Sequence, residues 1–503
     1  MNENFETNSD FTGEPVPQAP VKPARGRELI LAAVLLVACL WTANSVIFGG
    51  YGLGLALGLW TIMLATALYV LPKSGRGWYS VTCLGAALLL TASLLRSGDA
   101  FMKFCLFALS LGAYFLGLSQ WAEGARYSAG TAESLVGLRR AVFDLPYPAI
   151  APAFQGLFMR QTPEGPRKRK LGGVILGLLL AVPVLFVVIP LLMSSDAAFE
   201  GLVDRAMRLT DGEPVITLIV GAMLFLPVYA RPLALAEPQA PKEKLRYGQG
   251  IAPVTLNSFL CAVSLVYLVY LFSQLAYFFS AFEGILPQGF TQAEYARRGF
   301  FEMAVVCGIN LALVAFSTAA VRKTPELPRL TKALCLFVLG FSMVLVICSG
   351  SKMAMYIGAY GLTRLRVLTS LFMVCAAVAL ICAAVRLLRR SFPYMKIIVL
   401  TVLLVGCLAG FADVDTQIAR YNVDAYLSGR LETVDVQHLA ELSDGAIPEL
   451  ARLLDCQDDA VRIQARGCLE RIKDWRGTEE AADFRTWNWA AAQADRVLRE
   501  LNN

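Results

Sequence analysis

Charged and aromatic side chains gather in two short segments that interrupt long apolar runs. The first is QAEYARRGFFE at 292–302, in which Glu294, Arg298 and Glu302 are spaced one helical turn apart. Such spacing places the three side chains on one helix face, where opposite charges attract each other. An unpaired carboxylate at the mouth of a membrane span is costly, so Arg298 is the expected partner of Glu302. The pattern predicts an interfacial helix cap or, alternatively, a binding site.

The second segment is KMAMYIGAYGLTRLR at 352–366. Helical spacing places Lys352, Tyr356 and Tyr360 on one face. Gly361 is expected to break the helix, and Arg364 and Arg366 then precede the next apolar run. Tyrosines often anchor helices at the membrane interface. Their convergence with cations on a short turn predicts a ligand or partner site, with anchoring and loop closure as the alternative.

Two further stretches add polar groups to the same predicted face. The loop 194–214 contributes Asp196 and other carboxylates, and IARYNVDAYL at 418–427 contributes Tyr421. If these loops fold together, carboxylates within 196–204 could pair with Arg297, Arg298, Arg364 and Arg366. Such a network is more often structural than catalytic.

Signatures of enzyme chemistry are missing from the sequence. The chain has one histidine, His438, which excludes His-rich metal sites, HExxH proteases and an intramembrane Ser–His pair. No GxxxxGK loop supports nucleotide hydrolysis. The first outward loop is a bare Gly49–Gly50 turn, where lipid-linked-sugar transferases usually carry an acidic residue. We therefore predict no catalytic residue, no metal site and no cofactor, and no enzyme activity.

The amino-acid composition indicates that much of this chain lies in a lipid bilayer. Hydrophobic residues make up 56% of the sequence and charged residues 17%, and the mean hydropathy is +0.56. Runs of about 20 apolar residues recur, each long enough to cross the hydrocarbon layer as a helix. The predicted fold is an all-α polytopic membrane protein with about eleven transmembrane helices. These spans are 29–47, 51–71, 78–95, 101–118, 171–193, 215–230, 253–279, 300–321, 333–353, 367–385 and 397–411.

Lysine and arginine set the predicted orientation, because they accumulate in cytoplasmic loops. With the N-terminus inside, the inward segments hold most of these residues. The predicted domains are a disordered tail at 1–28, four spans within 29–118, a basic amphipathic loop on the inner surface at 119–170, and the other spans within 171–411. An odd number of spans places 412–503 outside. The outward loops hold only Arg96, Arg205, Arg208, Arg297, Arg298, Arg364 and Arg366.

Residues 412–503 are charged and predict a small extracytoplasmic helical domain. An amphipathic helix at 413–428 is expected to end at Gly429. The following segment, 446–472, resembles one HEAT-like helical hairpin, in which apolar residues of 447–454 face those of 461–472. Cys456 and Cys468 are predicted to lie roughly 15 Å apart, too far for a disulfide, and so to be free thiols.

Polar residues inside the predicted spans are sparse. Asn257, Gln274 and Asn310 are the clear ones, and hydrogen bonds between helices are their expected role. The predicted spans contain no series of carboxylates that would mark a path for protons or ions. This weakens the hypothesis that the protein is a coupled transporter.

Four motifs together are similar to a known family: SSDAAF, EYARRGFFE, YGLTRLR and IARYNVDAYL. This family consists of bacterial multi-pass membrane proteins and is known only as a domain of unknown function. The resemblance covers roughly 170–455, while the first four spans and the segment after 455 look less typical. It implies a bacterial cytoplasmic membrane protein and assigns no activity and no functional residue.

Two hypotheses of function follow. The leading one is a non-enzymatic binding or regulatory protein of the cell envelope, whose outer face binds an envelope ligand or a membrane protein partner. The alternative is a transporter or flippase-like carrier of a lipid or small solute. The lipid bilayer is the expected surrounding, and nucleic acid is not an expected partner. Outer motifs packed under 412–503 would favour binding, and a cavity lined by Asn257, Gln274 and Asn310 would favour transport.

Overall fold

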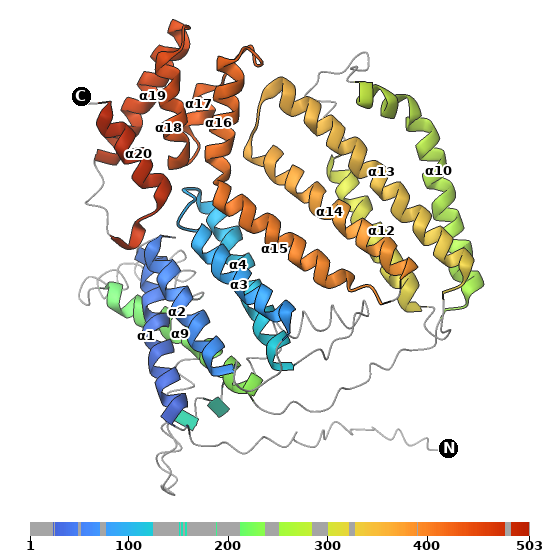
Figure 1. Cartoon of the computed structure of the whole chain (residues 1–503), viewed down its shortest axis with the longest axis horizontal. Helices are drawn as coiled ribbons and strands as arrows, with labels where there is room; N and C mark the ends of the chain where they lie inside the picture. The colour runs from blue at the N-terminus through green and yellow to red at the C-terminus, as the bar shows by residue number, and fades with distance from the viewer. Residues whose placement is uncertain are drawn as a thin grey trace, which may run out of the picture. The chain divides into compact units, whose positions relative to one another are not determined.

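The computed structural model of the chain describes residues 26–48, 52–70, 77–123, 212–236, 251–283, 300–320, 327–389, 391–477 and 484–501, and isolated positions at 24, 150, 152–153, 156–157 and 188. The regular elements of these residues are all helices (Figure 1). The chain divides into two compact units, one formed by 1–43 and 144–237, the other by 44–143 and 238–503.

The first unit contains α9 (Gly212–Ala236) and most of α1 (Gly26–Phe48). Both helices are apolar enough to cross a membrane. They pack closely at Gly221, where an added Cβ would lie 2.9 Å from the Cα of Leu40. A small residue at this crossing lets the two backbones approach, as is common between membrane helices.

The second unit begins with three packed helices, α2 (Leu53–Val70), α3 (Trp78–Ser93) and α4 (Ala100–Glu123). Hydroxyl groups link the two later helices, since Thr91 Oγ1 lies 2.7 Å from Ser110 Oγ. The short loop 94–99 joins α3 to α4 at one end of this group.

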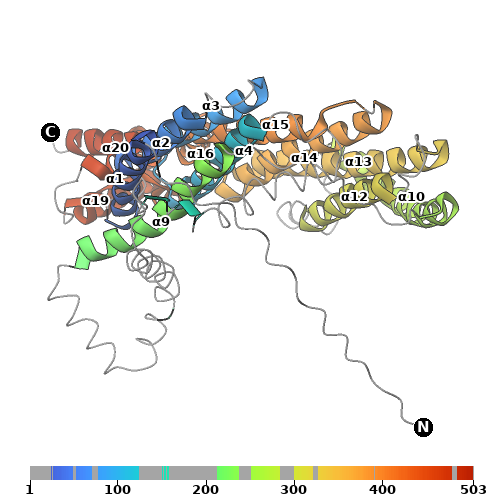
Figure 2. The same cartoon turned by 90° about the horizontal axis from the view of Figure 1, so that it is seen from below.

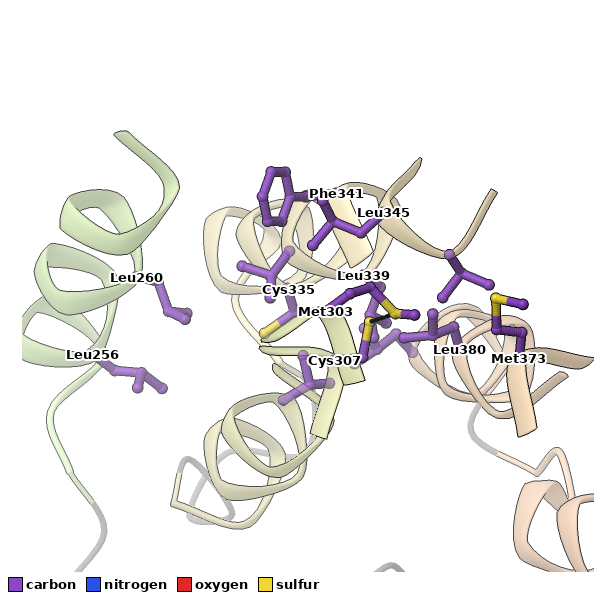
Figure 3. Close-up of a cluster of buried hydrophobic side chains, with 14 of the residues drawn as sticks. Leu256, Leu260, Met303, Cys307, Cys335, Leu339, Phe341, Leu345, Met373 and Leu380 are labelled. Atoms are coloured by element: carbon purple, nitrogen blue, oxygen red, sulfur yellow. Dashed lines mark hydrogen bonds between the residues drawn. The ribbon is translucent and has the colours of Figure 1, made fainter. Parts of the chain in front are cut away.

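A second group consists of α10 (Pro253–Glu283), α12 (Phe300–Ala320), α13 (Arg329–Tyr360) and α14 (Arg364–Leu388). These helices lie together in both views (Figure 1, Figure 2). They share an apolar core with α13 at its centre, contacted by Leu260 of α10, Cys307 of α12 and Leu380 of α14 (Figure 3). Between helices surrounded by lipid, such packing replaces the hydrophobic effect as the main source of association.

The helix α15 (Tyr394–Ala412) contacts both α14 and the pair α3–α4. It approaches the pair at Gly410, where an added Cβ would lie 2.7 Å from Ser93 Cβ and 3.0 Å from Leu106 Cδ1. It therefore links the two groups of membrane helices, and its last residue leads directly into the C-terminal helices.

Most of the predicted spans correspond to helices of this structure, and the number of about eleven stays a prediction. Every predicted span except 171–193, of which the structure describes only position 188, overlaps one of the helices named above. Eight of the described helices are long and apolar enough to cross a membrane, while α3 and the described part of α12 are shorter. The protein is thus an all-helical integral membrane protein.

Two of the three predicted intramembrane polar residues make the expected contacts between helices. Asn310 of α12 is fully buried, donates to Ser342 Oγ of α13 at 2.8 Å and accepts from Tyr267 of α10 at 2.6 Å. Asn257 accepts from Thr331 Oγ1 at 2.7 Å. The side chain of Gln274 lies outside the described residues.

After α15 the chain forms a cluster of shorter helices, which we call the C-terminal helices. They are α16 (Val414–Leu427), α17 (Val436–Ala440), η3 (Asp444–Ala446), α18 (Ile447–Ala451), η4 (Arg452–Asp455), α19 (Asp459–Gly477), η5 (Phe484–Thr486) and α20 (Trp489–Glu500).

The C-terminal helices share one core. Leu450 and Leu453 face Ala465 and Leu469 across the turn between α18 and α19, as predicted. Cys456 and Cys468 are both free, also as predicted. Gly429 has a φ of 73° just after α16, so it ends this helix in the left-handed conformation that glycine adopts most easily.

Replacing Asn310 by alanine should weaken the α10–α12–α13 packing by about 1–2 kcal/mol, because Ser342 and Tyr267 would lose a buried partner. Unfolding of the purified protein in mixed detergent micelles measures this change. The neighbouring Ile309 is exposed on the same helix, so Ile309→Ala is the matched control and should change the unfolding free energy by less than about 0.5 kcal/mol. Equal effects of the two variants would contradict the assigned role of Asn310.

Candidate functional site

The second predicted segment forms a tight turn between α13 and α14. Gly361 follows the last residue of α13 with a φ of 73°, a conformation that a side chain would strain. Thr363 then caps α14, since its hydroxyl accepts from the backbone N–H of Arg366 at 3.4 Å. Glycine and threonine at these positions thus end one membrane helix and begin the next within three residues.

Asn422 of α16 holds this turn from the other side. Its Oδ1 accepts from the backbone N–H of Leu362 at 2.7 Å, and its Nδ2 donates to the Leu362 carbonyl at 2.9 Å. An added Cβ at Gly361 would clash with Asn422 Oδ1, so glycine is also needed for this close approach. The side-chain amide of Asn422 therefore satisfies both backbone groups of Leu362, as the backbone of a neighbouring β-strand would.

Arg364 connects three elements through its guanidinium group. Its Nε donates to Asp415 Oδ1 at 2.7 Å and its Nη2 to Asp415 Oδ2, and the same Nη2 lies 2.9 Å from Asp99 Oδ1. The planar fork of arginine suits this two-point contact. Arg364 stands at the start of α14, Asp99 just before α4 and Asp415 in the first turn of α16. These three helix ends are consequently held together.

Asp415 is buried in the ionised form where these helix ends meet. Its side chain is 1% exposed, and burial alone would disfavour its charge. The bonds from Arg364 and from Ser443, whose backbone N–H lies 2.8 Å from Oδ2, outweigh burial and hold the pKa of Asp415 below its usual value. The ion pair therefore persists across the physiological pH range.

The loop between α3 and α4 packs beneath the C-terminal helices. Asp99 caps α4 by accepting from the backbone N–H of Met102 at 2.7 Å. The Leu95 carbonyl accepts from the backbone N–H of Trp489 at 2.7 Å. An added Cβ at Gly98 would lie 2.9 Å from Ser443 Cβ. Backbone bonds and close packing thus join this loop to η3 and α20.

Asp413 lies between α15 and α16. It is 2% exposed and has a φ of 53°, the one positive φ of a non-glycine residue in the described part of the chain. Its Oδ2 accepts from Thr416 Oγ1 at 2.6 Å, and Thr416 also donates to the Gly445 carbonyl at 3.0 Å. Burial raises the pKa of Asp413 to about 6, in spite of the bond from Thr416.

Further charges complete this cluster. Lys103 in the first turn of α4 is 7% exposed, and the carboxylates of Asp444, Asp413 and Asp99 interact electrostatically with it. Arg476 of α19 pairs with Asp444 and also with Asp495 at 2.8 Å. We call the set the ionic junction; it consists of Arg96, Asp99, Lys103, Arg364, Asp413, Asp415 and Asp444.

An aromatic and cationic surface adjoins the ionic junction. The guanidinium of Arg366 stacks 3.9 Å from the ring centroid of Tyr356, and the rings of Tyr356 and Tyr360 meet edge to face at 5.3 Å. Arg366 also donates to the Tyr360 carbonyl at 2.9 Å. Tyr360 is 51% exposed. We call these three residues the tyrosine–arginine surface.

The structure brings some of the predicted site residues together. Tyr356, Tyr360, Arg364 and Arg366 meet at the turn, and Lys352 lies on α13 before them. Tyr421 of α16 stacks with Arg430 at 5.7 Å. Arg364 pairs with Asp99 and Asp415, which were not among its predicted partners. The structure does not describe Asp196, Glu294 and Arg298, and it does not describe the side chain of Glu302.

Sequence reasoning missed the acidic half of the ionic junction and Lys103. One signal was present, because a lysine in an apolar run predicts a buried partner. Lys103 stands two residues into the predicted span 101–118, and Asp99 just before it. Within the described residues, no group of histidine, cysteine, aspartate or glutamate is arranged to hold a metal ion. The charged groups of this site offer ion pairing, hydrogen bonding and proton binding.

Comparison with known proteins gives one match. The model of a family described as a domain of unknown function, DUF4153, matches residues 56–453. This range ends close to the expected 455, but it begins well before 170 and includes α3 and α4, so these helices are typical of the family after all. No curated protein and no solved structure matches.

Arg364→Gln should destabilise the docking of the C-terminal helices by roughly 2–3 kcal/mol. Asp415 would remain buried without its ion pair, and the value is reduced from that of a fully buried pair because the Arg364 side chain is 38% exposed. Arg364→Lys should recover only part of the loss, since an ammonium cannot form the two-point contact. Resistance of the C-terminal helices to proteolysis in urea measures this, and an unchanged midpoint would contradict it.

Gly445→Ala should also weaken docking, by about 1–3 kcal/mol, because the new Cβ would clash with Asp413 Oδ2 and Thr416 Oγ1. The matched control is Gly467→Ala in α19, where an added Cβ meets nothing within 4 Å. That control should leave stability unchanged or raise it by up to about 1 kcal/mol, since alanine favours helix. The same urea titration compares both variants, and a harmless Gly445→Ala would refute the tight fit.

Proposed function

The chain belongs to the DUF4153 family, a domain of unknown function, and we propose from its geometry that it is a non-enzymatic binding protein of the bacterial cytoplasmic membrane. In this proposal the tyrosine–arginine surface binds an anionic component of the cell envelope. The C-terminal helices hold that surface in place and report its occupancy to a partner.

The observation that carries the proposal is the rigid support of this surface. Asn422 and Asp415, both from α16, fix the backbone and the first helical residues of the α13–α14 turn. Tyr360 and Arg366 flank this turn on either side. A surface held in one conformation loses little entropy on binding, which favours affinity. The binding hypothesis requires that the predicted outer-face motifs pack against the C-terminal helices, and the contacts of the α13–α14 turn with α16 support it.

The charge of the surface supports an anionic ligand. Arg366 of α14 provides a guanidinium, and Lys352 lies one helical turn before Tyr356 on α13. Arginine recognises phosphate and carboxylate groups by paired hydrogen bonds, and tyrosine suits the boundary between lipid and water. A phosphate or carboxylate of an envelope lipid or polymer fits these groups.

The contacts of the helix ends support the proposed orientation. The loop 94–99, the turn 361–363 and residues 413–415 meet at the ionic junction, so they lie at the same end of their membrane helices. Inward segments rich in lysine and arginine argue that this end is extracytoplasmic. With that orientation the N-terminus is cytoplasmic and the C-terminal helices lie outside.

The carrier alternative gains less support. A carrier needs polar groups that face a path through the membrane. Asn257 and Asn310 instead bond to neighbouring helices, and Asn310 is fully buried. Their hydrogen bonds hold α10, α12 and α13 together, so these two residues act as structural contacts.

A photo-crosslinking amino acid in place of Tyr360 tests the proposal in living cells. We expect a discrete adduct with an envelope component, because this side chain is half exposed beside Arg366. The matched control replaces Leu404, an exposed residue of α15, which should give adducts with bulk lipid only. Adding Arg366→Ala should reduce the Tyr360 adduct about tenfold or more, as loss of a charge-assisted contact predicts.

Arg420→Ala serves as the control for the second substitution, since this arginine is exposed on α16 and makes only a long contact of 3.9 Å to Asp424. It should leave the adduct unchanged. Identical adducts from the Tyr360 and Leu404 positions, or an adduct insensitive to Arg366→Ala, would refute the proposed binding surface.

A further inference from the structure

Asp413 occupies the one place where the membrane helices continue directly into the C-terminal helices. We propose that Asp413 is a proton-binding site that controls how firmly the C-terminal helices dock on the ends of α3, α4 and α14. Protonation strengthens docking and ionisation weakens it. The inference stands apart from the identity of any ligand of the tyrosine–arginine surface.

The backbone at Asp413 is the first observation. Its φ of 53° and ψ of 93° bend the chain between α15 and α16, where glycine would be the easiest residue. A side chain in such a conformation must be held by its surroundings, and residues of this kind concentrate at functional sites. The carboxyl group therefore has a role at this hinge that glycine could not supply.

The carboxyl group is the second observation. Oδ2 accepts from Thr416, while the buried Oδ1 has no hydrogen-bond partner among the described residues. Gly445 lies so close that any side chain there would clash with Asp413 Oδ2. An ionised carboxylate with an unsatisfied oxygen is costly in such a place, whereas the neutral acid is tolerated. The surroundings of Asp413 fit the protonated form better.

Charges face Asp413 from each element packed against it. Cations on the α3–α4 loop, on α4 and on α14 interact electrostatically with Asp413, as does an anion on α16; the carboxylates just before α4 and in η3 interact in turn with the cation on α4. The opposite signs offset one another, so little net positive charge remains to stabilise a further anion. These groups are Arg96, Lys103, Arg364, Asp99, Asp415 and Asp444.

The direction of the pH effect follows from the pKa of Asp413, which burial raises to about 6 from 3.8. A raised pKa of an acid means that the docked state prefers the proton. Docking is therefore strongest below pH 3.8 and weakens as the pH rises to about 6. If undocking restores the ordinary value, the docking equilibrium falls about tenfold between pH 5 and pH 7.5. Asp415 stays ionised throughout this range.

The test uses the full chain in nanodiscs, with fluorophores on unnatural amino acids at Ile463 of α19 and Leu365 of α14. Both positions are exposed, and their separation should increase when the C-terminal helices leave the membrane helices. Urea titrations at pH 5 and pH 7.5 then give the docking equilibrium. We expect docking about tenfold weaker at pH 7.5 for the natural chain. D413N, which is neutral and of equal size, should show the same docking at both pH values.

Three further variants keep the result interpretable. D424N removes an exposed carboxylate of the same helix and should leave the tenfold difference intact. In D413G, glycine adopts the positive φ easily and no carboxyl group remains to bind a proton, so this variant should also lose the pH dependence. D415N should lower the midpoint at both pH values, which shows that the fluorophores detect undocking. Equal docking of the natural chain at pH 5 and pH 7.5, or an undiminished pH effect in D413N, would overturn the proposal.

Discussion

The contact of one guanidinium group with two carboxylates determines how this end of the protein is built. Arg364 binds Asp415 at two points and reaches Asp99 with the same Nη2. These residues lie at the N-terminal ends of α14, α16 and α4, and α4 is far from the other two helices in the sequence. Because Asp415 is almost fully buried, its charge requires this partner, and the partner in turn fixes where the three helix ends lie. The other contacts at this end of the molecule depend on that arrangement.

Two neighbouring elements at this junction differ in character: the turn 361–363 is held rigidly, and Asp413 is strained. The turn 361–363 is rigid, because Asn422 satisfies both backbone groups of Leu362 and Gly361 permits the close approach. The neighbouring hinge at Asp413 is strained and carries a carboxyl group with one unsatisfied oxygen. In our two proposals, a rigid binding surface thus stands beside an element that is sensitive to protons. A membrane protein built in this way could couple the state of its surroundings to the position of its C-terminal helices.

Much of the fold could be predicted from local patterns in the sequence. Apolar runs located the membrane helices, because the thickness of the bilayer fixes their length. Gly361 and Gly429 ended helices where expected, since few residues adopt a positive φ. The pairing of α18 with α19 followed from helical periodicity. Each of these features depends on residues close together in the chain.

The ionic junction could not be predicted in the same way. The partners of Arg364 come from residues 99 and 415, and nothing local distinguishes them from other carboxylates near helix ends. Lys103 was hidden within an apolar run whose average hydropathy remained high. The helix α3 ends at Ser93, and the loop 94–99 that follows it contacts the C-terminal helices through Leu95 and Gly98. Such features arise from tertiary packing, and a linear pattern does not encode them.

The side of the membrane that the ionic junction and the C-terminal helices occupy decides whether the tyrosine–arginine surface meets the cell envelope or the cytosol. Fusions of a periplasm-active and a cytoplasm-active reporter after Asn503 measure this directly, with fusions in the predicted inward loop 72–77 as the opposite reference. We predict that only the periplasm-active reporter works after Asn503, which would place the tyrosine–arginine surface toward the envelope. Activity of the cytoplasm-active reporter at that position would contradict the account and direct the search to cytosolic partners.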